Sequence, residues 1–178
     1  MMETSWPNRE TRECWEIEAF IASYARLPHR RQLQIETKAE KPDYWVTDPS
    51  SGDRFGVELT SVYIDDRSVP DDHIPEREGL VPIPYDREQI ELYKGRLVQA
   101  VREKVEKARR GYDTRSPLIL SVYVNEYISI YLSSEELQEL VHANEAVFDN
   151  IEPFSEVVFW DLANGDVLSV RPSRRGAA

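Results

Sequence analysis

Residues 41–63, KPDYWVTDPSSGDRFGVELTSVY, contain the segment that decides the fold. Two apolar stretches flank the sequence Asp48-Pro49-Ser50-Ser51-Gly52-Asp53, which is rich in residues that favour turns. This pattern predicts a β-hairpin over residues 43–63. A turn centred on Ser50-Ser51 places Asp43 opposite Glu58, whereas a shift of one residue moves Glu58 opposite Pro42 or Tyr44.

The second strand of this hairpin carries an acid among apolar residues. Strand alternation puts Phe55, Val57 and Leu59 on one face and Glu58, Thr60 and Val62 on the other. A carboxylate in such a setting needs a partner, and two acids opposite each other on a sheet repel. We therefore expect a cation beside Glu58, which is either an arginine or lysine across the sheet or a metal ion. Mg²⁺ prefers the oxygen ligands that two converging carboxylates provide.

Composition narrows the class of protein. The chain has 178 residues, of which 40% are hydrophobic and 31% charged, enough for one core in one domain over residues 1–178. It contains no apolar run long enough to span a membrane, and its first residues, MMETSWPNRE, do not resemble a signal peptide. The single cysteine, Cys14, excludes an internal disulfide framework and is expected to pack in the core of a cytoplasmic protein.

Charge is distributed unevenly. The net charge of −11 argues against loose nucleic-acid affinity. Residues 65–91 hold nine acids and three bases. Most of this span lies in a Pro-rich loop predicted over about 63–86, and the remainder begins the helix predicted from residue 87. Basic clusters occur elsewhere, at His29-Arg30-Arg31, Lys107 to Arg110 and Arg171 to Arg175. They are compatible with a local basic patch, and equally with solvated charge at helix ends and in the tail.

Periodicity and turn signals predict the remaining elements. The apolar stripe of the first helix is Cys14, Ile17, Ile21, Tyr24 and Ala25, and that of the long helix is Ile90, Leu97, Val101, Val105 and Ala108. A capping box is expected at Ser133 to Glu136, and Asn164-Gly165 favours a type I′ turn. The expected elements are helix 11–27, strand 31–38, hairpin 43–63, helix 87–111, strand 116–125, a helix from Ser133 to about Phe148, and hairpin strands 156–162 and 166–172.

This order predicts an α/β protein in which helices flank a central mixed β-sheet that ends in a C-terminal β-hairpin. The tail, residues 173–178, is expected to be disordered. No heptad or exposed apolar stripe predicts an oligomer, so a homodimer and a protein partner both stay open.

Lys41-Pro42-Asp43, a short turn, and then Gly56-Val57-Glu58-Leu59-Thr60 resemble the PD-(D/E)xK, or restriction-endonuclease-like, nuclease superfamily. The resemblance covers roughly residues 13–125. It implies a Pro-Asp on one strand and a Glu/Asp-x-Lys on the next, with a glutamate-bearing helix before them and a second helix packed on the sheet after them. The elements expected here follow that order.

The resemblance assigns roles to individual residues. Asp43 matches the metal-binding aspartate and Glu58 the second ligand of Mg²⁺ or Mn²⁺. Glu18 is the first choice for the helix glutamate, which would position a water or a second ion, because it borders the apolar stripe. Glu16 is the second choice. For either residue, an ordinary surface glutamate is the alternative interpretation.

One position departs from the family pattern. Thr60 stands where the family has a lysine, which orients the attacking water and stabilises charge on the phosphate. Either another cation replaces that lysine or the site is inactive. Lys104 lies on the inward stripe of helix 87–111, three residues after Val101, and is the leading replacement, ahead of Lys107.

The sequence therefore predicts a metal-dependent endonuclease acting on DNA in preference to RNA, of the kind found in bacterial defence, repair or mobile elements. The alternative is an inactive nuclease-like fold that binds protein or nucleic acid. A third interpretation is an α/β protein whose carboxylates form only structural salt bridges.

Overall fold

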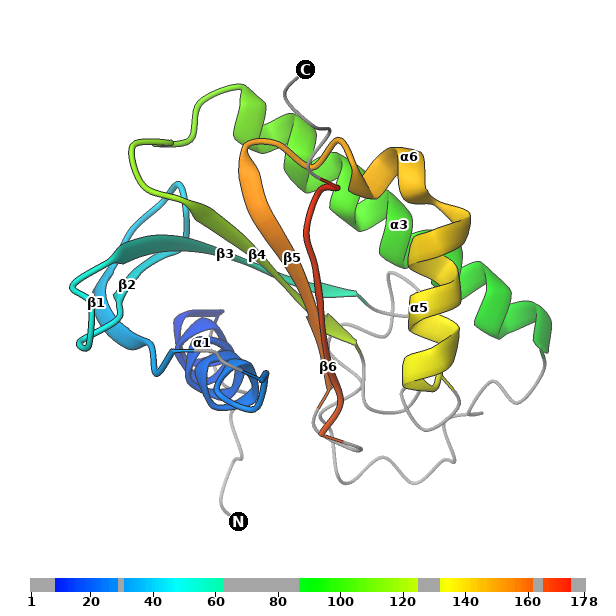
Figure 1. The fold of residues 1–178 in the computed structure, drawn as a ribbon, viewed down its shortest axis with the longest axis horizontal. Coiled ribbons are helices and arrows are strands. Elements are labelled where there is room, and N and C mark those ends of the chain that lie inside the picture. The colour runs from blue at the N-terminus through cyan, green and yellow to red at the C-terminus, as the bar shows by residue number, and fades with distance from the viewer. Residues whose placement is uncertain (1–8, 29–30, 63–86, 125–131, 162–164, 174–178) are drawn as a thin grey trace, which may run out of the picture.

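The computed structural model describes residues 9–28, 31–62, 87–124, 132–161 and 165–173. Its core is a six-stranded mixed sheet in the order β1-β2-β3-β4-β5-β6 (Figure 1). The strands are β1 (Gln34–Lys38), β2 (Tyr44–Thr47), β3 (Arg54–Val62), β4 (Leu118–Val124), β5 (Phe154–Trp160) and β6 (Val167–Val170). Strands β3, β4 and β5 are parallel neighbours, and the other neighbouring pairs are antiparallel. The predicted α/β class, the mixed sheet and the C-terminal hairpin are confirmed.

Helices cover both faces of this sheet (Figure 1). Helix α1 (Arg9–Tyr24) packs on one face. Helices α3 (Arg87–Arg109), α5 (Ser134–Ala143) and α6 (Glu145–Phe148) pack on the other. Strand β4 separates these two layers and is buried along its whole length, as expected for a central parallel strand. None of the described helices is both long enough and apolar enough to span a membrane.

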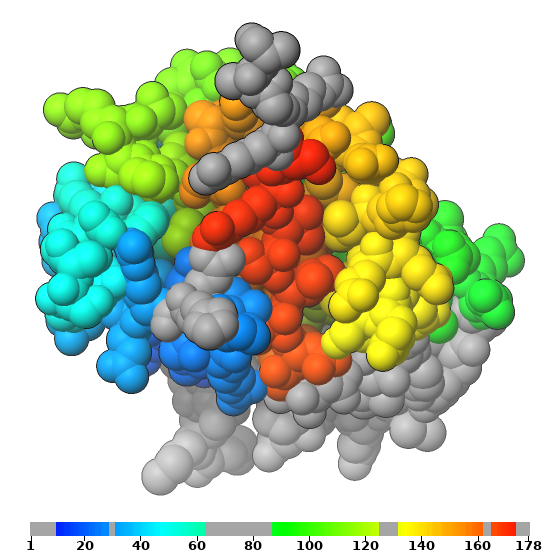
Figure 2. All heavy atoms as spheres, in the orientation of Figure 1, coloured from blue at the N-terminus to red at the C-terminus, as the bar shows by residue number. Residues whose placement is uncertain are grey.

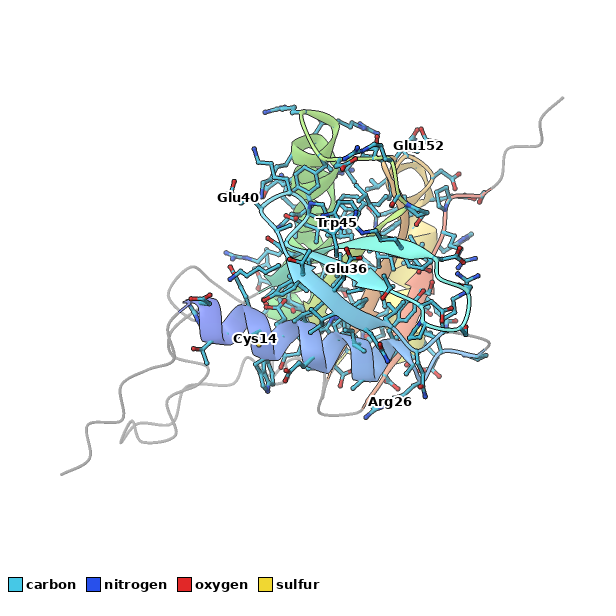
Figure 3. The ribbon with its side chains drawn as sticks, turned by 90° about the vertical axis from the view of Figure 1, so that its left-hand side faces the viewer. Cys14, Arg26, Glu36, Glu40, Trp45 and Glu152 are labelled. Atoms are coloured by element: carbon cyan, nitrogen blue, oxygen red, sulfur yellow. The ribbon has the colours of Figure 1, made fainter. Side chains whose placement is uncertain are left out.

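The two edges of the sheet differ in their surroundings. Strand β1 is exposed along its whole length, and Figure 3 shows it in front of the sheet with Glu36 labelled. Arg54 of β3 donates to both carboxylate oxygens of Glu36, at 2.8 and 2.9 Å. Strand β6 forms the other edge and appears at the surface between α1 and α5 in Figure 2. The charged side chains on β1 discourage pairing with another sheet.

The turn between β2 and β3 fixes the register. Asp48 is buried, and its Oδ1 accepts hydrogen bonds from Ser50 N at 2.8 Å and Ser50 Oγ at 2.6 Å. The Asp48 amide donates to Asp53 O at 2.9 Å, and Gly52 takes a φ of 75°, a region that glycine enters without steric cost. The ladder pairs Tyr44 with Val57, as the turn chemistry predicted.

The helices depart from their predicted bounds in small ways. The capping box at Ser133 and Glu136 is present, but the predicted helix through Phe148 is interrupted at Asn144, which divides it into α5 and α6. The loop predicted over 63–86, the tail from Arg174 and part of the Asn164-Gly165 turn lie outside the described residues.

The predicted apolar stripe of α1 is confirmed at Ile17, Ile21 and Tyr24 and wrong at its two ends. Cys14 and Ala25 are exposed, whereas Ile17, Phe20 and Tyr24 are buried. The expectation that Cys14 packs in the core is therefore wrong; Figure 3 labels Cys14 on α1. Phe20, which the predicted stripe omitted, is fully buried and packs against Trp160 of β5. The inward face of α1 is consequently rotated away from Cys14.

Candidate functional site

The candidate site begins where β2 ends and β3 continues alone. Hydrogen bonding alternates along the antiparallel ladder, and by this alternation the N–H and C=O of Leu59 point towards position 42. That position is Pro42, which has no N–H to donate to the Leu59 carbonyl. Side chains take over both roles. Asp43 Oδ2 accepts from Leu59 N at 2.8 Å, and Lys104 Nζ donates to Leu59 O at 2.8 Å. The Asp43 carboxylate and the Lys104 ammonium are thereby held beside the same strand residue.

Glu58 lies next to this point and is completely buried. Its Oε1 accepts hydrogen bonds from Lys104 Nζ at 2.7 Å and from Lys107 Nζ at 3.3 Å, both from α3. The Lys104 side chain is 22% exposed and that of Lys107 is 52% exposed. A buried carboxylate requires such partners, and Lys104 supplies the less hydrated one. Glu58 Oε2, however, is buried without a hydrogen bond.

Tyr112, just beyond the end of α3, lies against the same carboxylate. Its hydroxyl is also buried without a well-formed hydrogen bond. Burial raises the pKa of Tyr112, and hydrogen bonding to the negatively charged Glu58 raises it further. Lys107 Nζ lies 5.7 Å from the centre of the Tyr112 ring. Two polar atoms without good partners, Glu58 Oε2 and the Tyr112 hydroxyl, therefore face one region of the site.

Asp43 is half-buried, and its electrostatic environment joins it to Glu58. Burial raises the pKa of the Asp43 carboxyl, and the negative charge of Glu58 raises it further. The hydrogen bond from the Leu59 amide and the charge of Lys104 act in the opposite direction. The two carboxylates predicted from the hairpin register are thus close enough to repel each other.

Glu16 brings a third carboxylate to this cluster from α1. Burial raises the pKa of Glu16 to about 7, and the negative charge of Asp43 contributes to that rise. A hydrogen bond from Ser61 and the charge of Lys104 lower the pKa. Its Oε1 is buried without a hydrogen bond. The cluster formed by Glu16, Asp43, Glu58 and Lys104 is referred to below as the carboxylate–lysine cluster.

The structure does not bring Glu18, the first-choice helix glutamate, to this cluster. Glu18 is exposed, and the Cys14 thiol lies beside it, with Sγ 4.0 Å from Oε1. The reason is the phase of α1: its inward face is centred on Ile17, Phe20 and Tyr24. Glu16 lies one turn before Phe20 on that face, whereas Glu18 points away from it. Including Phe20 in the apolar stripe would have favoured Glu16.

Thr60 occupies the expected position on β3, two residues after Glu58, and pairs with Val122 of β4. It is partly exposed. The ammonium groups beside Glu58 come from α3 and not from β3, as the spacing of Lys104 on its helix predicted. Tyr112 was not predicted as a site residue; it follows the helix stop at Gly111, and no local motif marks it.

The donor set of the cluster suits a hard cation. Among the described residues, no three or more His, Cys, Asp or Glu side chains form a group that could hold a metal ion. Nevertheless, Glu16 Oε1 is buried without a hydrogen bond, and Glu58 Oε2 has only the poorly formed contact with the Tyr112 hydroxyl. Among the described residues, the Asp43 carboxylate accepts from the Leu59 amide alone. Carboxylate oxygens are the ligands preferred by Mg²⁺, and a cation would satisfy these acceptors and relieve their repulsion. The chemistry of these oxygens is therefore compatible with a cation, although they do not form a grouped metal site among the described residues.

Neither protein-family models, nor curated proteins, nor solved structures gave a match for this chain.

Proposed function

We propose that this chain is a metal-dependent nuclease of the PD-(D/E)xK type that hydrolyses phosphodiester bonds of nucleic acid, DNA in preference to RNA. The observation that carries the proposal is the 2.7 Å contact between Lys104 Nζ and Glu58 Oε1, beside Asp43. It supplies, from α3, the ammonium group that the family pattern places at position 60. Glu16, and not Glu18, is the helix glutamate in this proposal.

The arrangement of elements supports the same assignment. A helix carrying Glu16 precedes a strand that begins directly after Pro42-Asp43, and the next strand carries Glu58. Helix α3 then packs on the sheet and leads into the parallel strand β4. This is the order that the resemblance implies, although function depends on the site and not on the fold.

Asp43 and Glu58 would hold Mg²⁺ or Mn²⁺, with Glu16 as the third carboxylate. Such an ion, when bound, lowers the pKa of a water ligand and stabilises negative charge on a phosphate. The Leu59 amide orients the Asp43 carboxylate, and the Leu59 carbonyl orients the Lys104 ammonium. Lys104 would direct positive charge at the phosphate as its negative charge increases. Thr60 adds no charge, although its hydroxyl is able to donate a hydrogen bond.

The test is to incubate plasmid, single-stranded DNA and RNA with Mn²⁺ or Mg²⁺ and to compare wild type with Asp43→Asn and Glu58→Gln. Both substitutions keep the side-chain volume and remove one negative charge. Glu18→Gln is the matched control, because it removes the same charge from an exposed position. We expect cleavage by wild type and Glu18→Gln, and a loss of at least about a hundredfold in the other two variants. Cleavage that persists in Asp43→Asn excludes the assignment.

A second candidate function is a binding module that retains the nuclease-like fold without catalysis. The observation that favours it is that Lys104 and Lys107 both engage Glu58 Oε1, which gives the buried carboxylate internal counter-ions. Direct Mn²⁺ titration followed by electron paramagnetic resonance separates the two candidates. The nuclease binds Mn²⁺ through Asp43, and Asp43→Asn weakens that binding. The binding module takes up no Mn²⁺ at the cluster.

A further inference from the structure

A groove with a volume of about 530 Å³ lies along the outward side of the C-terminal half of α3. Charged residues dominate its lining, and it is referred to here as the α3 groove. Its charged lining residues are Lys41, Arg102, Glu103, Glu106, Lys107 and Arg110. Lys41 comes from the segment before β2, and the other five come from α3 and the residue after it.

The α3 groove is positively charged on a protein whose net charge is −11. Four cations and two acids line it. Glu106 pairs with Arg109 at 3.0 Å and with Arg110 at 3.9 Å, whereas Glu103 accepts from the neutral Gln99 amide at 2.8 Å and keeps its negative charge. In contrast, Lys41 and Arg102 form no ion pair with any residue that the structure describes. A groove whose cations outnumber its acids attracts a polyanion locally, even though the net charge of the whole protein repels it.

Lys107 connects the α3 groove to the carboxylate–lysine cluster. Lys107 lines the groove, and its Nζ also lies 3.3 Å from Glu58 Oε1. On the opposite wall, Lys41 precedes Asp43 by two residues. A chain lying in the groove therefore contacts Lys107, the lysine that reaches the buried Glu58 from the surface.

We propose that the α3 groove binds the sugar–phosphate backbone of the nucleic acid, an inference that rests on the proposed nuclease function and names the surface that holds its substrate. Arg102 and Arg110 are eight residues apart on or just beyond α3, which corresponds to about 12 Å along the helix axis. One strand of a duplex rises about 3.4 Å per nucleotide, so the groove spans about three or four consecutive phosphates.

The lining of the groove also defines the kind of recognition. None of the described residues that line it is aromatic, so it offers no platform on which exposed bases stack. Contacts from lysine and arginine to phosphates position a nucleic acid without reading its bases. Binding in the α3 groove is therefore driven by charge and is independent of sequence.

The experiment measures binding without cleavage. A fluorescein-labelled 20-base-pair duplex is titrated in EDTA with wild type, Arg102→Glu and Lys41→Glu, and anisotropy gives the dissociation constant at several salt concentrations. Neither residue belongs to the carboxylate–lysine cluster. We expect each reversal to raise the dissociation constant about tenfold and to reduce the slope of its logarithm against log salt by about one. Arg102→Ala, which removes the charge without reversing it, should raise the dissociation constant by a smaller factor. Melting curves confirm that the variants are folded.

Arg26→Glu is the matched control, because it makes the same charge change at an exposed arginine just after α1 (Figure 3). Its dissociation constant stays within about twofold of wild type if the groove is local. An equal loss in Arg26→Glu overturns the proposal, since net charge alone would then explain binding. Poly-glutamate is also added as a competitor. If it displaces the duplex when its carboxylate concentration is lower than the phosphate concentration of the duplex, the proposal is overturned and the groove is assigned to an acidic polypeptide.

The same measurements separate this proposal from the nuclease assignment. A wild-type chain that cleaves, with Arg102→Glu and Lys41→Glu binding as tightly as wild type, refutes the α3 groove and leaves the nuclease assignment standing. If the chain binds the duplex through Arg102 and Lys41 but cleaves under no metal condition, the nuclease assignment is refuted and the α3 groove stands.

Discussion

The Lys104 ammonium lies 2.7 Å from the carboxylate of Glu58, a side chain with no exposed surface, and so joins α3 to β3 across the core. The same ammonium donates to Leu59 O, which has no strand partner at position 42. One lysine therefore satisfies a buried charge and an edge carbonyl at once. Both contacts serve stability whether or not the cluster is catalytic.

Replacing Lys104 with Met is expected to destabilise the fold by about 2–3 kcal/mol, because a buried carboxylate then depends on Lys107 alone. Urea unfolding in EDTA measures the change. Lys107→Met, which removes the half-exposed partner of the same Glu58 oxygen, is the control and is expected to cost less than about 1 kcal/mol. Equal losses in the two variants would show that Lys104 is not the main counter-ion of Glu58.

The pH dependence of stability should reveal the buried state of Glu16. Its pKa is about 7 in the folded chain against an ordinary value of 4.5. Between these values the unfolded chain releases a proton that the folded chain keeps, so the free energy of unfolding falls as pH rises from 4.5 to 7. Glu16→Gln removes this loss. In EDTA we expect the variant to match wild type below about pH 4.5 and to exceed it by about 3 kcal/mol above about pH 7.

Glu18→Gln is the control for this titration, because Glu18 is exposed on the same helix and its substitution removes an equal charge. A gain above about pH 7 of equal size in Glu18→Gln would show that losing any carboxylate of α1, and not the burial of Glu16, explains the effect. Parallel pH profiles for Glu16→Gln and wild type would mean that the Glu16 carboxyl is hydrated in solution.

The sequence was sufficient to predict the hairpin register, and with it the approach of Asp43 to Glu58. The reason is local: Asp48, Ser50 and Gly52 define the turn, and a register is set by its turn. Lys104 was also within reach of sequence reasoning, because it interrupts an apolar stripe on a long and strongly periodic helix. Both inferences depend on contacts close together along the chain.

The choice between Glu16 and Glu18 could not be made from local sequence. The phase of α1 depends on which side chains the sheet accepts, and Cys14 is as apolar as the residues that are buried. The packing of Phe20 against Trp160, together with the burial of Ile17 and Tyr24, sets that phase. Likewise, Tyr112 meets Glu58 because α3 ends beside β3, a tertiary relationship without a local signature.

Position 60 offers a direct test of the catalytic proposal. In Lys104→Met we expect cleavage to fall by at least about a hundredfold, since the transition state loses its positive charge. Adding Thr60→Lys to that variant returns an ammonium group at the position the family pattern prescribes, on the face of β3 that carries Glu58. We expect cleavage to recover to within about tenfold of wild type. Recovery of folding without recovery of cleavage would restrict Lys104 to a structural role.

The close approach around Gly56 leads to the last prediction. A β-carbon there would lie 2.5 Å from Pro42 Cγ and 2.6 Å from Leu118 Cδ2, with the Trp45 ring at 3.2 Å. Pro42 lies just before β2, Trp45 lies within β2, and Leu118 is the first residue of β4. Gly56→Ala should therefore cost more than about 2 kcal/mol through overpacking, and it should weaken Mn²⁺ binding by displacing Pro42 and Asp43.

Gly95→Ala provides the comparison, because Gly95 lies within α3 with open space around its would-be β-carbon. There the substitution should stabilise the protein by about 0.5–1 kcal/mol, since alanine loses less backbone entropy than glycine in a helix. Urea midpoints and calorimetric Mn²⁺ titration of both variants give the two quantities. If Gly56→Ala is tolerated as well as Gly95→Ala, Pro42 is free to move, and the backbone before β2 does not fix the position of Asp43.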